Sequence, residues 1–326
     1  MSLNNERARP FFEYAREREA IRIRREVEGL PRPWTDDPIL NTYRFCNVYR
    51  EDDATTRWFR KWVRGPMADR PEVLLATVLF RWLNRVSSGE AIFRQLGDYT
   101  SDGRGHVRTA WEQYLADSRT ESLRLALTKY CGSGPYVTGA YIIKSPDGMS
   151  KLDGVLDSVA RFREGEPQAQ VVPRGWAPRK QPMDWYSMAT GKLDGSISYS
   201  MEQMWDWLKR FPFLGGFTAY EIVTDLRHTA LLRSAPDIYT WANAGPGAVR
   251  GLNRLHGRKL SASNNGYVAV CEMRELLALA QGEFRHVWPT REGQPVEMRD
   301  IEHTLCEFDK YERTRLGEGR PRGTYK

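Results

Sequence analysis

The sequence lacks the features of a membrane-spanning or secreted protein. No apolar run approaches the ~18 residues that a membrane-spanning helix requires, and the mean hydropathy is −0.61. The opening segment, MSLNNERARP, has no apolar signal core, so we expect a cytoplasmic protein. The four cysteines form no CxxC pair, which excludes a disulfide framework, a four-cysteine zinc site and a closely spaced iron–sulfur loop; they are Cys46, Cys131, Cys271 and Cys306.

Several catalytic motifs are also missing. There is no GxxxxGK[ST], so a self-contained P-loop kinase is excluded; the segment GSGPYVTG has the glycines without the lysine. Neither HExxH nor GxSxG occurs. The histidines are dispersed without paired ligand spacing, so we expect no metal site and no cofactor; they are His106, His228, His256, His286 and His303.

Lysine is scarce, whereas arginine is abundant. The chain has ten lysines among 49 basic residues, against 42 acidic residues, for a net charge of +7. Arginine pairs bidentately with phosphates and stacks on bases, so this bias favours a nucleic-acid partner. The alternative is that a GC-rich genome favours arginine codons and that many arginines lie on solvated helix faces.

Helical patterns dominate the 326 residues, and strand signals are few. The apolar segment 71–86 predicts a core helix, residues 11–29 predict a helix ending at Gly29, and residues 39–63 predict two helices broken near Asp52. We therefore expect a mainly α fold. We expect three parts, namely an N-terminal helical lobe (1–135), a second lobe (136–300) and a C-terminal helix with a basic tail packing back on the lobes (301–326).

The segment LKRFPFLGGFTAYEIVTDL (208–226) predicts a helix, a glycine turn and a second helix. Such a helix-hairpin-helix would use Gly215 and Gly216 to reach unusual dihedrals and to point backbone N–H groups at a DNA phosphate, with Lys209 and Thr218 beside them. An ordinary αα-hairpin explains the pattern equally well. Asp237 follows about twenty residues later, which resembles the offset of the essential aspartate in helix-hairpin-helix DNA glycosylases; the alternative role for Asp237 is a helix N-cap.

Three blocks of sequence resemble one known family. They are ERARPFFEYARERE with PWTDDPILNTYRFCNVYREDDATTRWFRKWV, then NAGPGAVRGLNRL, and IEHTLCEFDKYERTRLGEGRPR. The chain resembles the alpha-glutamyl/putrescinyl-thymine pyrophosphorylases, which are described as DNA base hypermodification proteins and whose helical domain also accompanies 5-hydroxymethyluracil DNA kinases. Cys46 departs from the pattern, where threonine or another small residue is expected.

The resemblance implies a DNA-glycosylase-like fold of two helical lobes with a cleft, and an enzyme that acts on a flipped pyrimidine in double-stranded DNA. An amino acid or polyamine amine would displace phosphate or pyrophosphate from phosphorylated 5-hydroxymethyluracil, in a phage pathway that evades host restriction. The alternative activity is a glycosylase that excises a modified base from phage DNA. A third reading is an accessory that presents flipped bases to a separate kinase.

The transferase reading needs cations for the leaving phosphate and a base for the amine proton. The candidate substrate-binding residues are Arg44, Asn47, Arg50 and Lys310, the candidate bases are Asp237, Glu302 and Glu307, and Arg250 is a further DNA-binding candidate. Glu302, Cys306 and Asp309 share a helix face by their spacing. The alternatives are an internal salt-bridge network for the arginines and a solvated helix face for the C-terminal acids. In the glycosylase reading Asp237 is catalytic.

We expect a monomer without membrane contact. Aromatic side chains would stack on the flipped base. The candidates are Trp34, Tyr43, Trp185, Tyr186 and Tyr239.

Overall fold

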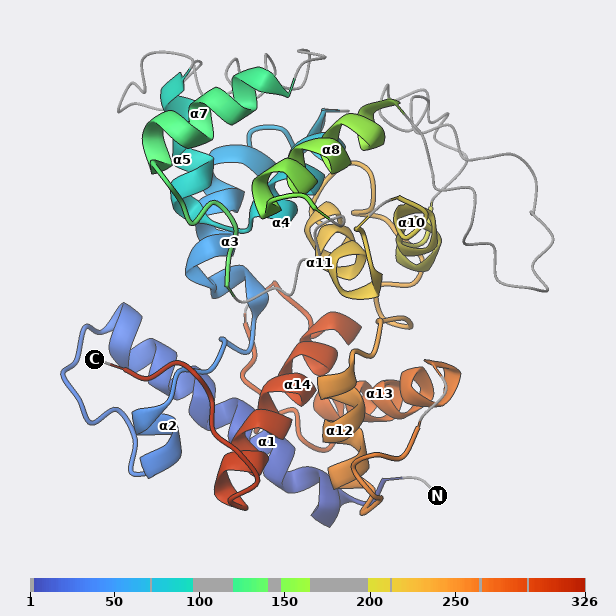
Figure 1. Cartoon of the computed structure of the whole chain (residues 1–326). Coiled ribbons are helices and arrows are strands. Elements are labelled where there is room, and N and C mark those ends of the chain that lie inside the picture. Colours follow the sequence, from blue (N-terminus) through green and yellow to red (C-terminus); the bar gives the residue numbers. More distant parts are fainter. Residues whose placement is uncertain are drawn as a thin grey trace. The chain divides into compact units, whose positions relative to one another are not determined.

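A computed structural model describes residues 3–70, 72–95, 120–139, 148–164, 199–211, 213–263, 266–291 and 293–325. Over these ranges the chain is helical and contains no strand, apart from the isolated bridges Tyr43–Thr324 and Arg291–Gln294 (Figure 1). The mainly α prediction is confirmed. Within the same ranges, no helix is both long enough and apolar enough to cross a membrane. Trp185 and Tyr186 lie outside the described residues.

The chain divides into two compact units, and the first is built from both ends of the chain. Unit 1 comprises Met1–Asp53 and Asp237–Lys326, and unit 2 comprises Ala54–Pro236. These limits differ from the expected lobes 1–135 and 136–300, because the first helix packs against the last one. The C-terminal segment 301–326 lies in unit 1.

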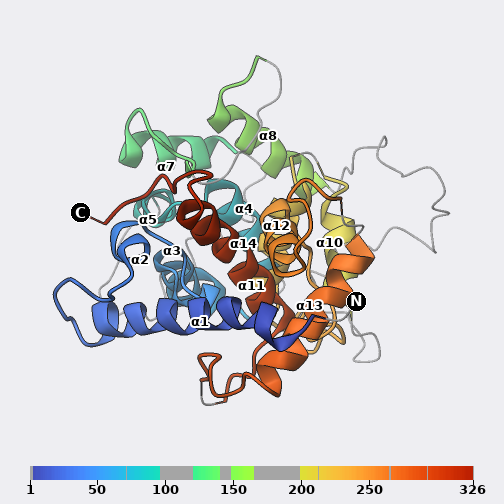
Figure 2. The same cartoon turned by 90° about the horizontal axis from the view of Figure 1, so that it is seen from below.

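Unit 1 contains five α-helices with two shorter turns among its described residues. They are α1 (Asn5–Arg22), which continues into a π-helical turn (Ile23–Val27), α2 (Pro38–Thr42), a 3₁₀ turn (Arg50–Asp52), α12 (Pro246–Leu255), α13 (Gly266–Gln281) and α14 (Met298–Arg315). Figures 1 and 2 show α12 and α14 side by side, with α1 and α13 also packed on α14.

Aromatic rings fill the core of unit 1. The ring of Phe12 stacks on Phe284 at a centroid distance of 4.3 Å, and Phe11 meets Phe308 of α14 edge-on at 5.8 Å. Phe11 and Phe12 are fully buried, because the α-helical period places both on the side of α1 that faces the core. The contact between Phe11 and Phe308 joins α1 to α14, two helices far apart in the sequence.

A short loop replaces one helix that the sequence predicts. Helix α2 ends at Thr42, and residues 43–49 are extended before the 3₁₀ turn. Side chains of other elements satisfy the backbone of this loop: Arg18 donates to the carbonyls of Phe45 (3.0 Å) and Cys46 (3.1 Å). Tertiary hydrogen bonds therefore override the local helical pattern.

Unit 2 is organised around α4, the core helix expected from its apolar sequence. Every residue of α4 (Val73–Leu83) is buried, and α11 (Gly216–Leu226) packs against it. The carboxylate of Asp225 on α11 lies between the buried guanidinium groups of Arg64 and Arg81. Among its described residues, unit 2 also contains α3 (Ala54–Phe59) with a π-helical turn (Arg60–Arg64), α5 (Val86–Gln95), α7 (Glu121–Cys131), α8 (Lys151–Glu164) and α10 (Met201–Leu208).

Candidate functional site

The extended loop of residues 43–49 is fixed in place by Arg18 and Asn47. Asn47 is buried; its Oδ1 accepts from Arg18 (2.8 Å) and its Nδ2 donates to the carbonyl of Asp52 (3.1 Å). Its backbone N–H donates to the Oδ1 of Asp53 (3.1 Å). Because these bonds engage the amide group of Asn47 with protein groups, its position suits loop support rather than the substrate contact expected from sequence.

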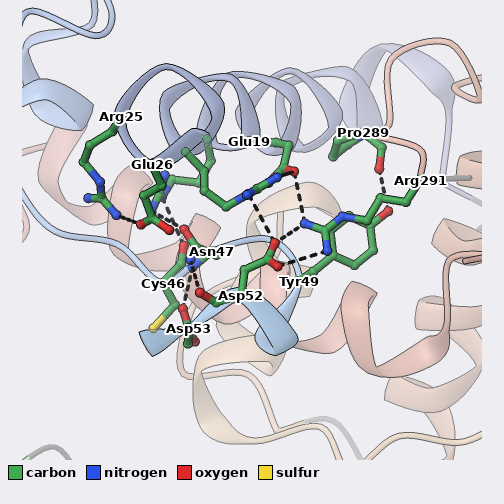
Figure 3. Close-up of polar contacts among 12 residues, drawn as sticks. Glu19, Arg25, Glu26, Cys46, Asn47, Tyr49, Asp52, Asp53, Pro289 and Arg291 are labelled. Carbon is green, nitrogen blue, oxygen red and sulfur yellow. Dashed lines mark hydrogen bonds and ion pairs between the residues drawn. The ribbon is translucent and has the colours of Figure 1, made fainter. Parts of the chain in front are cut away.

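Four charged side chains tie the end of this loop to α1. Figure 3 shows Asp52 facing both α1 and Arg291; Arg291 donates to Asp52 (Nη1 to Oδ1, 3.2 Å) and to Glu19 (3.1 Å). Arg22 of α1 pairs with Glu19 at 2.7 Å and with Asp52 at 3.2 Å. The acidic end of the YREDD segment thus lies in the internal salt-bridge network considered above.

Glu307 and Lys310 of α14 lie against the same loop. Glu307 is buried, accepts from the backbone N–H of Cys46 at Oε2 (3.0 Å) and binds Lys310 through Oε1. Lys310 is 37% exposed in its side chain. The ammonium group of Lys310 therefore keeps donors for a ligand, while both oxygens of Glu307 are engaged.

Burial and charge act in opposite directions on this pair. Burial raises the pKa of Glu307, but the charges of Lys310 and His303 and the hydrogen bonds to the carboxylate outweigh it and leave the pKa below its usual value. Burial lowers the pKa of Lys310, yet the Glu307 carboxylate outweighs it and the pKa stands above the ordinary value. Both groups are therefore charged at neutral pH.

We call the six side chains gathered here the Cys46 cluster. Burial and the Glu307 carboxylate raise the pKa of the Cys46 thiol well above its usual value, against the opposing charges of Lys310 and Arg50. Burial also lowers the pKa of His303, with Arg50 adding to the effect. One ligand atom each from Cys46, Asp53 and His303 lies within 4.8 Å of the others, so these three could hold a metal ion. The cluster comprises Cys46, Arg50, Asp53, His303, Glu307 and Lys310.

The adjoining face of α14 carries the three residues that the helical spacing groups together. Glu302 accepts from the backbone N–H of Gly245 (3.4 Å), and Asp309 is fully buried between Arg250 (2.8 Å) and Arg254 (2.9 Å). A Cβ built on Gly247 would lie 2.4 Å from the Sγ of Cys306. All three contacts are with α12 or its N-cap, so these C-terminal acids do not form a solvated helix face.

A cavity of about 530 Å³ opens at the N-terminus of α12. It is lined in part by Ala244, Pro246 and Arg250, and the residue between the first two, Gly245, bonds Glu302. Arg250 is thus placed at a cavity wall while pairing with Asp309. This hollow lies within unit 1, beside Glu302.

Helices α10 and α11 pack against each other across the segment expected to form a helix-hairpin-helix, but the turn between them lacks the unusual glycine dihedrals expected there. Gly215 is the N-cap of α11 at φ −66°, and no glycine there has a positive φ; the left-handed residue is Phe213 at φ 60°. Gly215 is exposed, and a Cβ on it would meet nothing within 4 Å. Thr218 is buried, so its side chain is not exposed for the DNA contact expected from sequence. Lys209 lies over the Trp205 ring (3.3 Å to the centroid).

Arg44 and Asp237 are not members of the Cys46 cluster as defined above. Arg44 is exposed, and its guanidinium lies 5.7 Å from the ring centroid of Tyr325. Asp237 is half-buried, and its backbone carbonyl accepts from the N–H groups of Thr240 and Trp241. These bonds form a turn, so Asp237 does not cap the N-terminus of a regular helix. Of the expected aromatic residues, Trp34 packs edge-on against Tyr325 at 5.0 Å.

Sequence reasoning missed Arg18, Asp53 and His303. Arg18 belongs to a helix rich in alternating charge, where nothing marks it as the buried one. His303 and Asp53 are separated from Cys46 by very different chain lengths, so no spacing motif indicates their convergence. The one available signal was the position of His303 one turn before Glu307 on the same predicted helix.

Comparison with known proteins gives one family. A family model described as the helical domain of 5-hmdU DNA kinase matches residues 5–320. The chain is 24% identical over 309 residues to a 5-hmdU DNA kinase of Bacillus phage SP10. That match covers 90% of this chain but 43% of the relative, so the chain spans less than half the relative's length. No solved structure matches the chain.

Proposed function

Because the chain belongs to the family of 5-hmdU DNA kinase helical domains, we propose that it modifies a hydroxymethylated pyrimidine in phage DNA. Specifically, it transfers the amine of an amino acid or polyamine onto phosphorylated 5-hydroxymethyluracil, as the resemblance to alpha-glutamyl/putrescinyl-thymine pyrophosphorylases implies. The enzyme acts as a monomer on double-stranded DNA in the host cytoplasm, and the product protects phage DNA from restriction.

The transfer step is favoured over phosphorylation by what the sequence lacks. The relative is named a kinase, but more than half of its length lies outside the match. This sequence has no GxxxxGK[ST] motif, and so no P-loop to cradle the phosphates of a nucleotide. A reaction that consumes a phosphorylated base, and needs no nucleotide, therefore fits this chain better.

The observation that carries the proposal is one stripe of α14. Glu302, Cys306 and Lys310 follow at intervals of four residues, so they lie along one side of the helix over about 12 Å. Both Glu302 and Lys310 act on the electrostatics of Cys306 between them. The stripe offers a cation at one end and a carboxylate at the other, within reach of a single phosphorylated nucleotide.

Each end of the stripe has one task in the reaction. The amine nitrogen attacks the methylene carbon of the base, a C–N bond forms, and the C–O bond to the phosphate breaks. Lys310, with Arg50 nearby, stabilises the departing phosphate, and Glu302 takes the proton that the amine releases. Glu307 does not serve as the base, because Lys310 and the Cys46 N–H occupy its two oxygens.

The α10–α11 hairpin supplies the grip on the duplex. The exposed Gly215 leaves space for a phosphate to approach the first N–H groups of α11. Gly215→Glu would fill that space with a negative charge. We expect it to weaken binding to duplex DNA about tenfold or more in a fluorescence-anisotropy titration at fixed salt, with an unchanged melting temperature.

The activity test supplies duplex DNA carrying phosphorylated 5-hydroxymethyluracil together with glycine, other amino acids or putrescine. Mass spectrometry of the digested nucleosides should show an amine adduct and release of phosphate. Lys310→Met should slow the reaction by about 10²–10³-fold, and Glu302→Gln, which retains an acceptor for Gly245, should also slow it. Lys129→Met, an exposed lysine of unit 2, is the matched control and should retain full activity.

Three results would contradict the proposal. An unmodified nucleoside pool with every amine would exclude transfer. Abasic sites in hydroxymethylated or glucosylated DNA, abolished by Asp237→Asn, would identify a glycosylase instead. DNA binding that only stimulates a separate kinase, without chemistry by this protein, would identify an accessory.

A further inference from the structure

Three potential metal ligands meet in unit 1 from separate segments. Cys46 belongs to the extended loop, Asp53 follows the 3₁₀ turn, and His303 lies in the second turn of α14. One ligand atom from each lies within 4.8 Å of the other two. The three donors are a sulfur, a carboxylate oxygen and an imidazole nitrogen.

The backbone of Cys46 and the side chain of Asp53 are held in place by other residues. The N–H of Cys46 donates to Glu307 (3.0 Å) and its carbonyl accepts from Arg18 (3.1 Å). Asp53 is oriented by the N–H of Asn47 (3.1 Å). A site supported in this way is organised before a ligand arrives, as outer-shell contacts do for metal sites.

Two potential metal-ligand atoms of these side chains make no hydrogen bond within the described part of the chain. The Nε2 atom of His303 is buried and has no hydrogen-bond partner within the described part of the chain. Among the same residues, the Sγ of Cys46 makes no hydrogen bond, although the backbone of Cys46 makes two. Buried polar atoms are ordinarily satisfied, so an unpaired imidazole nitrogen here calls for an absent partner.

We propose that Cys46, Asp53 and His303 form a zinc-binding site. A thiolate, an imidazole and a carboxylate together match the borderline-soft character of Zn²⁺, whereas Mg²⁺ and Ca²⁺ prefer oxygen ligands alone. Three protein ligands leave one tetrahedral position for water or a substrate oxygen, as in catalytic zinc sites. The thiol loses its proton on binding, and the two resulting negative ligand charges balance the ion.

The observed spacing requires only small side-chain movements. Tetrahedral zinc holds its ligand atoms roughly 3.3–3.8 Å apart, as its bond lengths dictate. The three atoms lie within 4.8 Å of one another, so rotation about side-chain bonds closes the site without moving α14. Glu307 remains hydrogen-bonded to the Cys46 N–H and supports the loop from behind.

The test measures metal binding directly and does not depend on the proposed transfer reaction. The full chain is stripped with a chelator, titrated with Zn²⁺ and, separately, with Co²⁺, and analysed for bound metal after gel filtration. We expect one Zn²⁺ per chain, a rise in melting temperature, and for Co²⁺ the absorption bands of a tetrahedral thiolate site.

Cys46→Ser, His303→Gln and Asp53→Asn should each weaken Zn²⁺ binding by more than ~100-fold, beyond the loss expected for an outer-shell partner. Asp53→Asn keeps an acceptor for the Asn47 N–H, so it tests the site in a folded protein if another variant unfolds. Cys306→Ser and His256→Ala are the matched controls, and both should bind one ion. Absence of stoichiometric Zn²⁺, or full binding by the folded ligand variants, would overturn the assignment.

Discussion

Asp225 is a buried acid with two buried cations. Its Oδ1 accepts from Arg64 at 2.8 Å, its Oδ2 pairs with Arg81, and each of the three side chains is at most 2% exposed. Removing one member of such a group leaves an uncompensated charge in a low-dielectric interior. Asp225 therefore contributes to stability through the arginines that it neutralises.

We expect Asp225→Asn to lower the free energy of unfolding of unit 2 by roughly 3–5 kcal/mol. Urea denaturation followed by circular dichroism would measure the loss. Asp157→Asn, which breaks the more exposed pair with Arg161 on α8, should cost less than about 1 kcal/mol. Equal losses for the two variants would show that burial does not set the strength of the Asp225 group.

Asp300 makes stability depend on pH in the opposite sense to an ordinary acid. Burial raises its pKa to about 7, although the hydrogen bond from the Glu297 N–H and the charges of Arg299 and Arg291 oppose the shift. Between the ordinary value near 4 and this value, the folded state binds more protons than the unfolded state. This contribution to stability is complete below about pH 4 and disappears as pH rises through 7.

Asp300→Asn keeps an acceptor for the Glu297 N–H and removes the titration. Its free energy of unfolding, relative to the parent protein, should be higher by roughly 2–3 kcal/mol at about pH 8 than at about pH 5. Chemical denaturation at both pH values would measure the difference. A constant difference between the two proteins would mean that Asp300 ionises in the folded state as readily as in the unfolded one.

At this scale the sequence indicated some residues and not others. The C-terminal acids and Lys310 are candidates on sequence grounds because one amphipathic helix carries them. Asn47 was expected to contact substrate, yet it holds the loop, because its partner Arg18 lies on a helix that the pattern could not orient. The meeting of His303 with Asp53 depends on how α14 packs on the loop, which is a long-range property.

Helices α12 and α14 approach each other closely at two glycines. A Cβ on Gly251 would lie 2.6 Å from the backbone carbonyl oxygen of Leu305, closer than any real contact. The backbone of α14 cannot yield as a flexible side chain would. The pair of helices must therefore separate if Gly251 gains a side chain, and the face that carries Glu302 and Asp309 would separate from α12 with it.

Gly251→Ala should destabilise unit 1 by roughly 1–3 kcal/mol, the usual cost of overpacking. Thermal unfolding would register a lower melting temperature. Gly266→Ala, at the start of α13 with nothing within 4 Å of the added Cβ, is the matched control and should be neutral or slightly stabilising. A harmless Gly251→Ala would argue against the close α12–α14 contact.

Elements with strong local patterns were predictable, and those set by tertiary contact were not. The apolar run of α4 and the stop of the first helix near Gly29, which has a φ of 67°, follow from sequence alone. The loop at residues 43–49 reads as helix, because its aromatic spacing is helical while its hydrogen bonds come from Arg18 and Glu307. In the α10–α11 turn, the left-handed residue is Phe213, although the glycines beside it suggested otherwise.

On the scale of the whole molecule, unit 1 joins distant parts of the chain. The N–H of Arg44 donates to the carbonyl of Gly323 (2.9 Å), and that of Tyr325 donates to Thr42 (3.0 Å). Arg25 and Arg32 also lie over the Tyr325 ring. These contacts fasten the C-terminal segment onto the loop after α2, within a unit whose residues are spread over all three of the parts expected from sequence.

Deleting residues 320–326 should therefore loosen one region of unit 1 and leave unit 2 unaffected. Loss of the Gly323 acceptor should speed amide exchange at Arg44 about fivefold, which corresponds to the roughly 1 kcal/mol net value of one hydrogen bond. Hydrogen-exchange mass spectrometry would compare peptides covering 40–46 with peptides of α4. Faster exchange in α4 as well would indicate that the two units unfold together.

The split composition of unit 1 also sets an order of events at the ribosome. Phe11 and Phe12 leave the exit tunnel well before Phe284 and Phe308, against which they pack, are translated. Throughout synthesis of residues 54–236 the nascent first helix therefore displays uncovered aromatic rings. A chaperone that shields this helix would have its longest engagement during that interval, and emergence of Phe284 and Phe308 would release it.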